Sequence, residues 1–305
     1  MLAILTKQAD HQTITDADWQ KIFSSEPYIR LKKRESSMHR AFTDEAFQKF
    51  VLSPELTARR LQLQKTLDSW KRADLHAAAA RILPYLPADA RIRATVYPVI
   101  KPQTNSFVFE QNAIFLYVNP ETSATEFQNT VAHECHHIGL SSAGAAYDKQ
   151  IESEGPNVKP VLTWIGAFGE GLAVLAAAGS PDVHPLAAYN EDERKRWDSD
   201  MKYWDREFAE LDQFFQDILR GGFTDKDTIT HVAFTFFGYR GPWYLVGYKM
   251  AVVIEKELGR AALLEGMTDP RKLLLHYNKA AKQINSAGKE KLPLWSDPVI
   301  AAMSK

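Results

Sequence analysis

Residues 131–140 read VAHECHHIGL and place three histidines and a glutamate around the only cysteine of the chain. On an α-helix, residues four positions apart share a face, so His133 and His137 point the same way and can grip one metal ion. Glu134 lies beside them on the adjoining face. This spacing is the H-E-x-x-H pattern, which predicts a helix that binds a metal ion.

The residues around the motif support the helix that it requires. Ser123 or Thr125 is expected to cap the start of this helix, and Gly139 is expected to end it. His136 lies off the face of the two ligands, and Cys135 points away from it as a packing residue. Apolar side chains flank the motif on both sides: Val131, Ala132, Ile138 and Leu140. They favour a partly buried helix over the alternative, a polar surface helix.

A zinc site that does chemistry needs a third protein ligand and an open fourth position for water. The candidate ligands downstream of the motif are Asp148, Glu152, Glu154 and Glu170. Glu170 is the single charged residue in the apolar segment 161–180, where a carboxylate is costly to bury unless it is paired or bound to metal. We expect it to be the ligand; pairing with an Arg or Lys is the alternative, and Glu152 and Glu154 are typical of a solvated loop. Small neighbours are expected to let its helix approach the metal-binding helix closely: Gly169, Gly171 and Ala173.

The periodicity of apolar residues predicts a chain that is mostly helical. Helical spacing recurs over residues 14–23, 44–52, 53–82, 161–178, 190–219 and 242–259, besides the metal-binding helix. Pro242 starts the last of these helices and Gly259 ends it. Residues 91–118 instead carry short β-type runs, RATVYPVI, SFVFE and AIFLYV, which predict about three strands. The expected fold class is mostly α with a small β-sheet (α+β).

The 305 residues are 45% apolar, enough to bury a full-sized core. We find no repeat or flexible linker in them and expect a single domain over 1–305, with a helical scaffold in 1–90 and the core that holds the metal site in 91–285. Lys and Arg total 37 against 38 Asp and Glu, so the net charge points to no nucleic acid and no membrane as partner. The N-terminus shows no leader pattern and Cys135 has no partner for an internal disulfide, so a cytoplasmic location is expected.

The motifs together resemble a known group of enzymes. HECHH followed by GEGLA is similar to the gluzincins, metallopeptidases in which two histidines of H-E-x-x-H and a later glutamate hold zinc. With PWYLVGYKMA and IEKELGR added, residues 90–285 resemble a family of zinc-dependent peptidases known mainly from sequence. The resemblance implies a zincin-like core, one zinc ion held by His133, His137 and Glu170, and Glu134 as the general base.

One position departs from part of the gluzincin group. Some members place an acidic residue four positions after the ligand glutamate, where this chain has Val174. Histidines that bind metal usually donate their second ring N–H to an orienting group. The candidate for that group is Asn129, one turn before His133.

Hydrolysis of a carbonyl compound forms a tetrahedral oxyanion, which needs at least one more hydrogen-bond donor. The stretch YRGPWYLVGYKMA offers Arg240, Tyr244 and Tyr248 at spacings of four, with Gly247 leaving room beside the tyrosines. We expect Tyr248 to be the donor, then Tyr244, with His231 as a third option. The alternative is that both tyrosines are core residues whose hydroxyls are satisfied elsewhere.

By resemblance, the substrate binds along the edge strand before the metal-binding helix, and SFVFE at 106–110 is the expected edge. The expected partner is a peptide or a small protein, and the expected function is zinc-dependent hydrolysis of peptide bonds. Two alternatives stay open: a metal-binding protein with a structural or regulatory role and no turnover, and a zinc hydrolase of non-peptide amides. Glu134 favours an enzyme, because a structural site has no use for a base beside an open coordination position.

Overall fold

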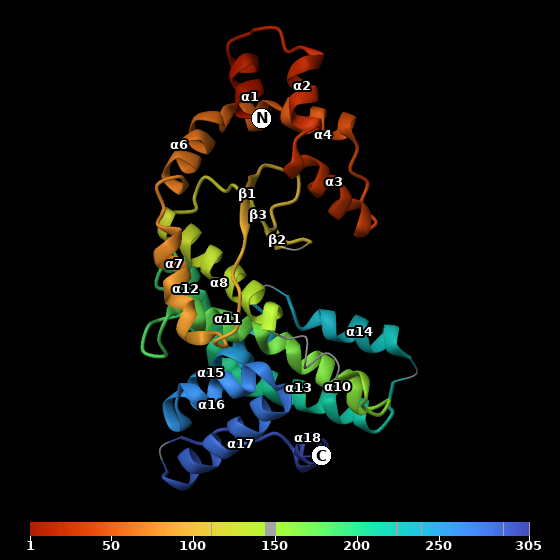
Figure 1. Ribbon diagram of the computed structural model, residues 1–305, viewed down its shortest axis with the longest axis vertical. Coiled ribbons are helices and arrows are strands. Elements are labelled where there is room, and N and C mark those ends of the chain that lie inside the picture. Colours follow the sequence, from red (N-terminus) through yellow and green to blue (C-terminus); the bar gives the residue numbers. More distant parts are fainter. Residues whose placement is uncertain (111, 144–150, 224, 239, 289, 305) are drawn as a thin grey trace. The chain divides into compact units, whose positions relative to one another are not determined.

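The computed structural model describes residues 1–110, 112–143, 151–223, 225–238, 240–288 and 290–304. The chain is mostly helical with one small sheet (Figure 1), which confirms the predicted α+β class. It divides into two compact units, residues 1–74 with 93–131 and residues 75–92 with 132–305. These units do not follow the expected boundary at residue 90, because the strands group with the N-terminal helices. A single domain stays a prediction.

The first unit begins with six short helices, several of which start at a polar cap. Thr15 and Asp18 form a capping box at the second helix, and the side chain of Thr43 accepts the N–H of Ala46 at the fourth. The helices are α1 (Leu2–Ala9), α2 (Asp16–Phe23), α3 (Glu26–Ser37), α4 (Asp44–Val51), α5 (Pro54–Ala58) and α6 (Arg60–Trp70).

The run expected as one helix over residues 53–82 is three helices, α5, α6 and α7 (Leu75–Ile82). The second of them ends at a buried anchor. Trp70 stacks on Phe127 with ring centroids 4.4 Å apart, and its indole Nε1 donates to the carbonyl of Thr122 at 3.3 Å. The tertiary contacts of this side chain therefore interrupt a pattern that is helical throughout.

The three predicted strands form one sheet in the order β1-β3-β2. They are β1 (Thr95–Val99), β2 (Phe107–Val108) and β3 (Ala113–Tyr117). The central strand pairs with β1 in parallel and with β2 in antiparallel fashion, and its first four residues are buried. A strand covered on both faces is expected to read as a continuous apolar run, as AIFLYV does.

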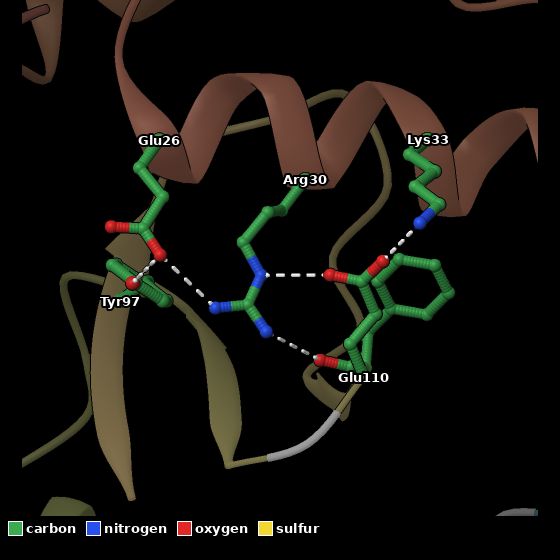
Figure 2. A network of polar contacts seen from close by, with 6 residues as sticks. Glu26, Arg30, Lys33, Tyr97 and Glu110 are labelled. Atoms are coloured by element: carbon green, nitrogen blue, oxygen red, sulfur yellow. Dashed lines mark hydrogen bonds and ion pairs between the residues drawn. The ribbon is translucent and has the colours of Figure 1, made fainter.

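A polar network ties α3 to the sheet (Figure 2). Arg30 lies between two carboxylates: its Nη1 donates to Glu26 Oε1 at 3.2 Å, and its Nε pairs with Glu110 Oε2 at 3.1 Å. Tyr97 of β1 donates to the same oxygen of Glu26 at 2.8 Å, and Lys33 pairs with Glu110. Since Tyr97 lies on β1 and Glu110 lies in the connection between β2 and β3, the contacts hold α3 against the sheet of this unit.

The second unit is built from helices. Pro242 opens one of them and Gly259, at φ 87°, closes it, as predicted. Besides α7 and the C-terminal part of α8 (Ala124–Ala143), the described residues of this unit form η1 (Leu83–Tyr85), α10 (Val158–Ile165), η2 (Gly166–Phe168), α11 (Gly169–Ala178), α12 (Glu191–Asp200), η3 (Met201–Tyr203), α13 (Trp204–Leu219), α14 (Lys226–Thr235), α15 (Pro242–Leu258), α16 (Arg260–Thr268), α17 (Pro270–Ser286) and α18 (Asp297–Met303).

Helices α11 and α15 lie side by side with their backbones in contact (Figure 1). A Cβ on Gly171 would lie 2.1 Å from the backbone nitrogen of Tyr248, and one on Gly247 would lie 2.7 Å from the carbonyl oxygen of Phe168. The expectation that Gly169 and Gly171 serve the approach to the metal-binding helix is therefore wrong: Gly171 contacts α15, and no described neighbouring residue lies within 4 Å of a Cβ on Gly169. Gly247 does leave room beside the tyrosines, and α11 fills it. Gly171 and Gly247 both lie in the contact between α11 and α15. This contact places the tyrosines of α15 near the start of α11.

Candidate metal centre

Helix α8 (Ala124–Ala143) carries the H-E-x-x-H motif. The hydroxyl of Ser123 accepts the N–H of Glu126 at 3.1 Å, so the predicted cap is confirmed. The helix runs on past Gly139, which was expected to end it. This glycine is buried, and a Cβ there would lie 2.6 Å from Leu86 Cδ1. It is a glycine because a neighbouring side chain packs against it, and the C-cap expectation is wrong.

The helix is partly buried, as its apolar flanks predicted. One face is closed off by Val131, Ala132, Cys135 and His136. The side chains of His133 and His137 lie elsewhere on the helix and are 17% and 27% exposed. Burial, with the charge of Glu134, raises the pKa of the Cys135 thiol to about 11, which fits the predicted packing role.

Three ligand atoms from two helices converge on one point. Glu170 Oε2 lies 3.1 Å from His133 Nε2 and 3.3 Å from His137 Nε2, and the two ring nitrogens lie 3.1 Å apart. Among the described residues this is the one cluster of His, Cys, Asp or Glu with such spacing. Glu170 stands in the first turn of α11, within a helical segment that runs over Val158–Ala178. The structure thus brings together the three residues that the sequence singled out.

This donor set fits zinc. Zinc bonds to nitrogen and oxygen of about 2.0–2.2 Å at tetrahedral angles separate neighbouring ligand atoms by about 3.4 Å. The observed separations of 3.1 to 3.3 Å are close to that value. Two imidazoles and a carboxylate are also a known ligand set of catalytic zinc, which keeps its fourth position open. The partial exposure of all three side chains agrees with an open side.

The charges of the cluster are mutually dependent. Burial disfavours the ionised form of Glu170, but hydrogen bonds from His133 and His137 outweigh it and hold the pKa of the carboxyl far below its usual range. Burial likewise disfavours the charged form of His137, but the hydrogen bond and charge of Glu170 raise the pKa of that imidazole. An ionised carboxylate therefore attracts positive charge to this point.

The two predicted tyrosines of α15 have different surroundings. The ring of Tyr244 stacks on His133 with centroids 6.4 Å apart, which places this tyrosine beside the cluster. Burial and the charge of Glu170 raise the pKa of Tyr244 well above its usual value, so the hydroxyl keeps its proton. One turn later, Tyr248 packs edge-on against Trp197 at 5.3 Å, and burial raises its pKa to about 12. Tyr244 therefore lies beside the cluster, whereas Tyr248 packs against Trp197.

Glu134 and His136 occupy two sides of α8. The charge of Glu134 contributes to the raised pKa values of His137 and Tyr244, so its carboxylate acts on the cluster without being among the converging ligand atoms. His136 is fully buried, and its Nε2 donates to the carbonyl oxygen of Tyr85 at 3.1 Å. Burial lowers the pKa of His136 to about 3, so this ring is neutral. The sequence does not predict this contact, because Tyr85 accepts the hydrogen bond through its backbone carbonyl.

The other candidate ligands and donors lie in different settings. Asp148 falls outside the described residues. Glu152 is exposed, whereas Glu154 forms an ion pair with Arg271. His231 is exposed on α14. None of these described side chains belongs to the converging set.

Three further expectations stay predictions. Asn129 is 6% exposed one turn before His133, which is the position expected of an orienting group. Arg240 pairs with Glu193 at 2.9 Å. Strand β2, the expected substrate edge, does lie at an edge of the described sheet, but it belongs to the first unit and the cluster to the second.

One described helix, Val158–Ala178, is long and apolar enough to cross a membrane. Of its most apolar stretch, 61% is buried inside the structure, and a core helix of a soluble protein gives the same pattern. Since this segment carries Glu170 into the cluster, its apolar character is accounted for by packing around the site.

The match to a family model agrees with this geometry. Neither a curated protein nor a solved structure matches the chain with significant similarity. A family described as "Putative zinc dependent peptidase (DUF5700)" matches residues 9–286, a span that contains the H-E-x-x-H helix, the glutamate helix and α15. The chain therefore belongs to this family.

Proposed function

We propose that the protein is a gluzincin-like zinc hydrolase that cleaves peptide bonds, with His133, His137 and Glu170 as the ligands of one zinc ion. The observation that carries the proposal is the convergence of their ligand atoms within 3.3 Å of one another. The family match to zinc-dependent peptidases supports the same reaction class.

Zinc in such a site supplies a Lewis acid that polarises a carbonyl group and makes water acidic near neutral pH. Glu134 is assigned as the general base: it accepts a proton from the attacking water and passes it to the leaving amine. Tyr244 is assigned as the donor to the oxyanion, because its protonated hydroxyl already lies at the cluster. Tyr248 becomes the second choice for that role, since its ring packs against Trp197.

A structural or regulatory metal site is the alternative from another class. Structural zinc sites are closed by four protein ligands, whereas the described cluster has three and is partly exposed. A base such as Glu134 also has no purpose in a closed site. These two features favour turnover.

The proposed substrate is a peptide or a small protein, with no nucleic acid or membrane as partner. A cytoplasmic location is also part of the proposal. Any amide carbonyl fits the carboxylate, imidazole and tyrosine groups of the cluster. The test must therefore distinguish a peptidase from a hydrolase of non-peptide amides.

The test combines metal analysis with a digest. The full chain is purified without added chelator, its zinc content is measured, and a peptide library is incubated with the native, the chelated and the zinc-restored protein. We expect one zinc per chain and cleavage that chelation abolishes and zinc restores. Stoichiometric zinc with hydrolysis of small amides but not of peptides would assign the non-peptide reaction, and zinc with no hydrolysis at all would support a structural role.

A further inference from the structure

A cavity of about 170 Å³ opens in the second unit beside the metal-binding helix. One wall comes from α8 after the motif, at Leu140, Ser141 and Ala143. A second wall comes from the helical segment that carries Glu170, and the end of the cavity is formed by the last residues of α16 and the first turn of α17. All of its walls lie in the unit that holds the candidate metal centre.

The cavity lies one helical turn from the ligands on both helices. Ser141 follows His137 by four residues, and Gly166 precedes Glu170 by four, which is about 6 Å along each axis. Since His137 meets Glu170 while Ser141 and Gly166 line the same cavity, the two helices pass in opposite directions here. The cavity therefore begins about one helical turn from the cluster, on the side where both helices run past their ligands.

Two glycines leave this space open. A Cβ on Gly166 or on Gly169 would have no described atom within 4 Å, although Gly169 is buried. A buried glycine with empty space beside it is unlike Gly171, where the backbone of another helix takes the room. The glycines before Glu170 thus keep a cavity, whereas the glycine after it makes a helix contact.

The lining is apolar and uncharged. The interior is made by Ile165, Leu172, Met267 and Leu273, all buried, and none of the described residues that line the cavity is charged. The exposed Ser141 and Thr268 stand at its rim, where the hydroxyl of Thr268 is satisfied by the carbonyls of its own helix at 3.1 and 3.2 Å. A charged group would lose its hydration here without gaining a partner, which is costly.

The size of the cavity sets the size of its occupant. An apolar protein cavity of about 150 Å³ is large enough to bind benzene. The space of about 170 Å³ beside the cluster therefore accepts one apolar side chain of the size of leucine, methionine or phenylalanine.

We propose that this cavity is the specificity pocket of the enzyme and receives an uncharged apolar side chain next to the scissile bond. The inference rests on the proposed function, since it takes the cluster as the place where the carbonyl binds. It names Gly166 and Gly169 as the residues that determine specificity, because both line the pocket and neither has a described neighbouring residue within 4 Å of an added Cβ.

Binding of two small zinc chelators tests the pocket without turnover. N-acetyl-leucine hydroxamate and N-acetylglycine hydroxamate differ by one apolar side chain, and their affinities for the zinc-loaded full chain are measured by calorimetry. Burial of the leucine side chain is expected to tighten binding by about tenfold or more. In Gly169→Leu, and independently in Gly166→Leu, the added side chain fills the pocket, so the two affinities should come within about twofold.

Gly155→Leu is the matched control, because Gly155 is exposed, outside the cavity and equally open around its Cβ. It should keep the leucine preference of the wild type. Equal affinities in the wild type, or a leucine preference that survives in both pocket variants, would overturn the inference. Chelator-sensitive digestion of the peptide library by the same preparation tests the function separately. Peptide cleavage by a protein that binds both hydroxamates equally would reject the pocket and keep the proposed hydrolase. Selective binding of the leucine hydroxamate without any cleavage would reject the hydrolase and keep the cavity as a binding pocket for the leucine side chain.

Discussion

Two carboxylates of this protein differ in the partners that surround them. Glu35, in the first unit, is fully buried between two arginines, with Arg34 Nη1 at 2.9 Å and Arg40 Nη1 at 3.2 Å. Glu170, in the second unit, meets two histidines instead. Guanidinium groups are always charged, so the first carboxylate is neutralised by the protein itself. Imidazoles bind metal in their neutral form, so the second can share its charge with an ion.

The partner therefore separates a structural carboxylate from a metal ligand. A buried carboxylate with arginines is complete without a ligand. A carboxylate whose oxygen converges with two ring nitrogens is complete when a cation joins it.

The largest expected effect comes from removing the carboxylate that meets histidines. Glu170→Ala should lower zinc affinity by more than about 100-fold and abolish hydrolysis, because one of three ligands is lost. Zinc titration and circular dichroism measure affinity and fold. Glu152→Ala, which removes an exposed glutamate, is the control and should change neither. If Glu170→Ala still binds one zinc ion with unchanged affinity, Glu170 is not a metal ligand and does not differ from Glu35 in that respect.

A third carboxylate sharpens the contrast, because Glu134 acts on the cluster without being a ligand. Glu134→Gln should keep zinc and fold while kcat falls by about 10²- to 10⁴-fold, the usual contribution of a general base. Parallel zinc and activity assays measure both effects. Turnover within a few fold of wild type would move the base elsewhere.

Substitution of Glu35, the carboxylate between two arginines, should change the stability of the protein and not its zinc affinity. Glu35→Ala leaves two guanidinium groups beside a buried gap, and we expect the free energy of unfolding to fall by about 3–5 kcal/mol. Urea unfolding of the zinc-loaded protein measures it. The zinc affinity of the folded protein should not change; a loss comparable to that in Glu170→Ala would show that the two sites are not independent.

The tyrosines of α15 provide a paired comparison on one helix. Tyr244→Phe removes a hydroxyl at the cluster and should lower kcat and kcat/KM equally, by about 100-fold, with zinc content unchanged. Tyr248→Phe removes a hydroxyl from a ring that packs on Trp197 and should leave turnover within about twofold. The reverse pattern would restore Tyr248 as the donor.

The smallest effect concerns Lys101, which belongs to the surroundings of Glu35. The side chain is 1% exposed, and burial, opposed by the charge of Glu35, lowers its pKa to about 8. Between about pH 8 and 10.5 the unfolded chain holds a proton that the folded chain has lost, so stability should rise with pH in this window. From pH 8 to 9.5 the gain of wild type over Lys101→Met should be about 1–2 kcal/mol in urea unfolding. A parallel pH course of the two proteins would refute the lowered pKa.

The parts that sequence predicted are those set by local spacing. The i, i+4 histidines, the lone charge in an apolar segment, the Ser123 cap and the Pro242 and Gly259 helix ends each follow from nearby residues. The class of the fold and the three strands also follow from short-range periodicity.

The parts that sequence did not predict depend on contacts between distant segments. Gly139 reads as a helix end, but it is the neighbour of Leu86. From the sequence, Gly171 was expected to contact the metal-binding helix and Gly247 to leave room beside the tyrosines. Both glycines lie in the contact between α11 and α15, and this contact places Tyr244 near Glu170. Spacing alone places both tyrosines on one face and cannot rank them.

X-ray absorption at the zinc edge of the zinc-loaded protein tests the ligand set directly. Ligation by His133, His137 and Glu170 predicts a first shell of nitrogen and oxygen alone at about 2.0–2.2 Å, with outer-shell scattering from two imidazoles. A sulfur neighbour at about 2.3 Å, which Cys135 would supply, or scattering from a single imidazole would contradict the ligand set.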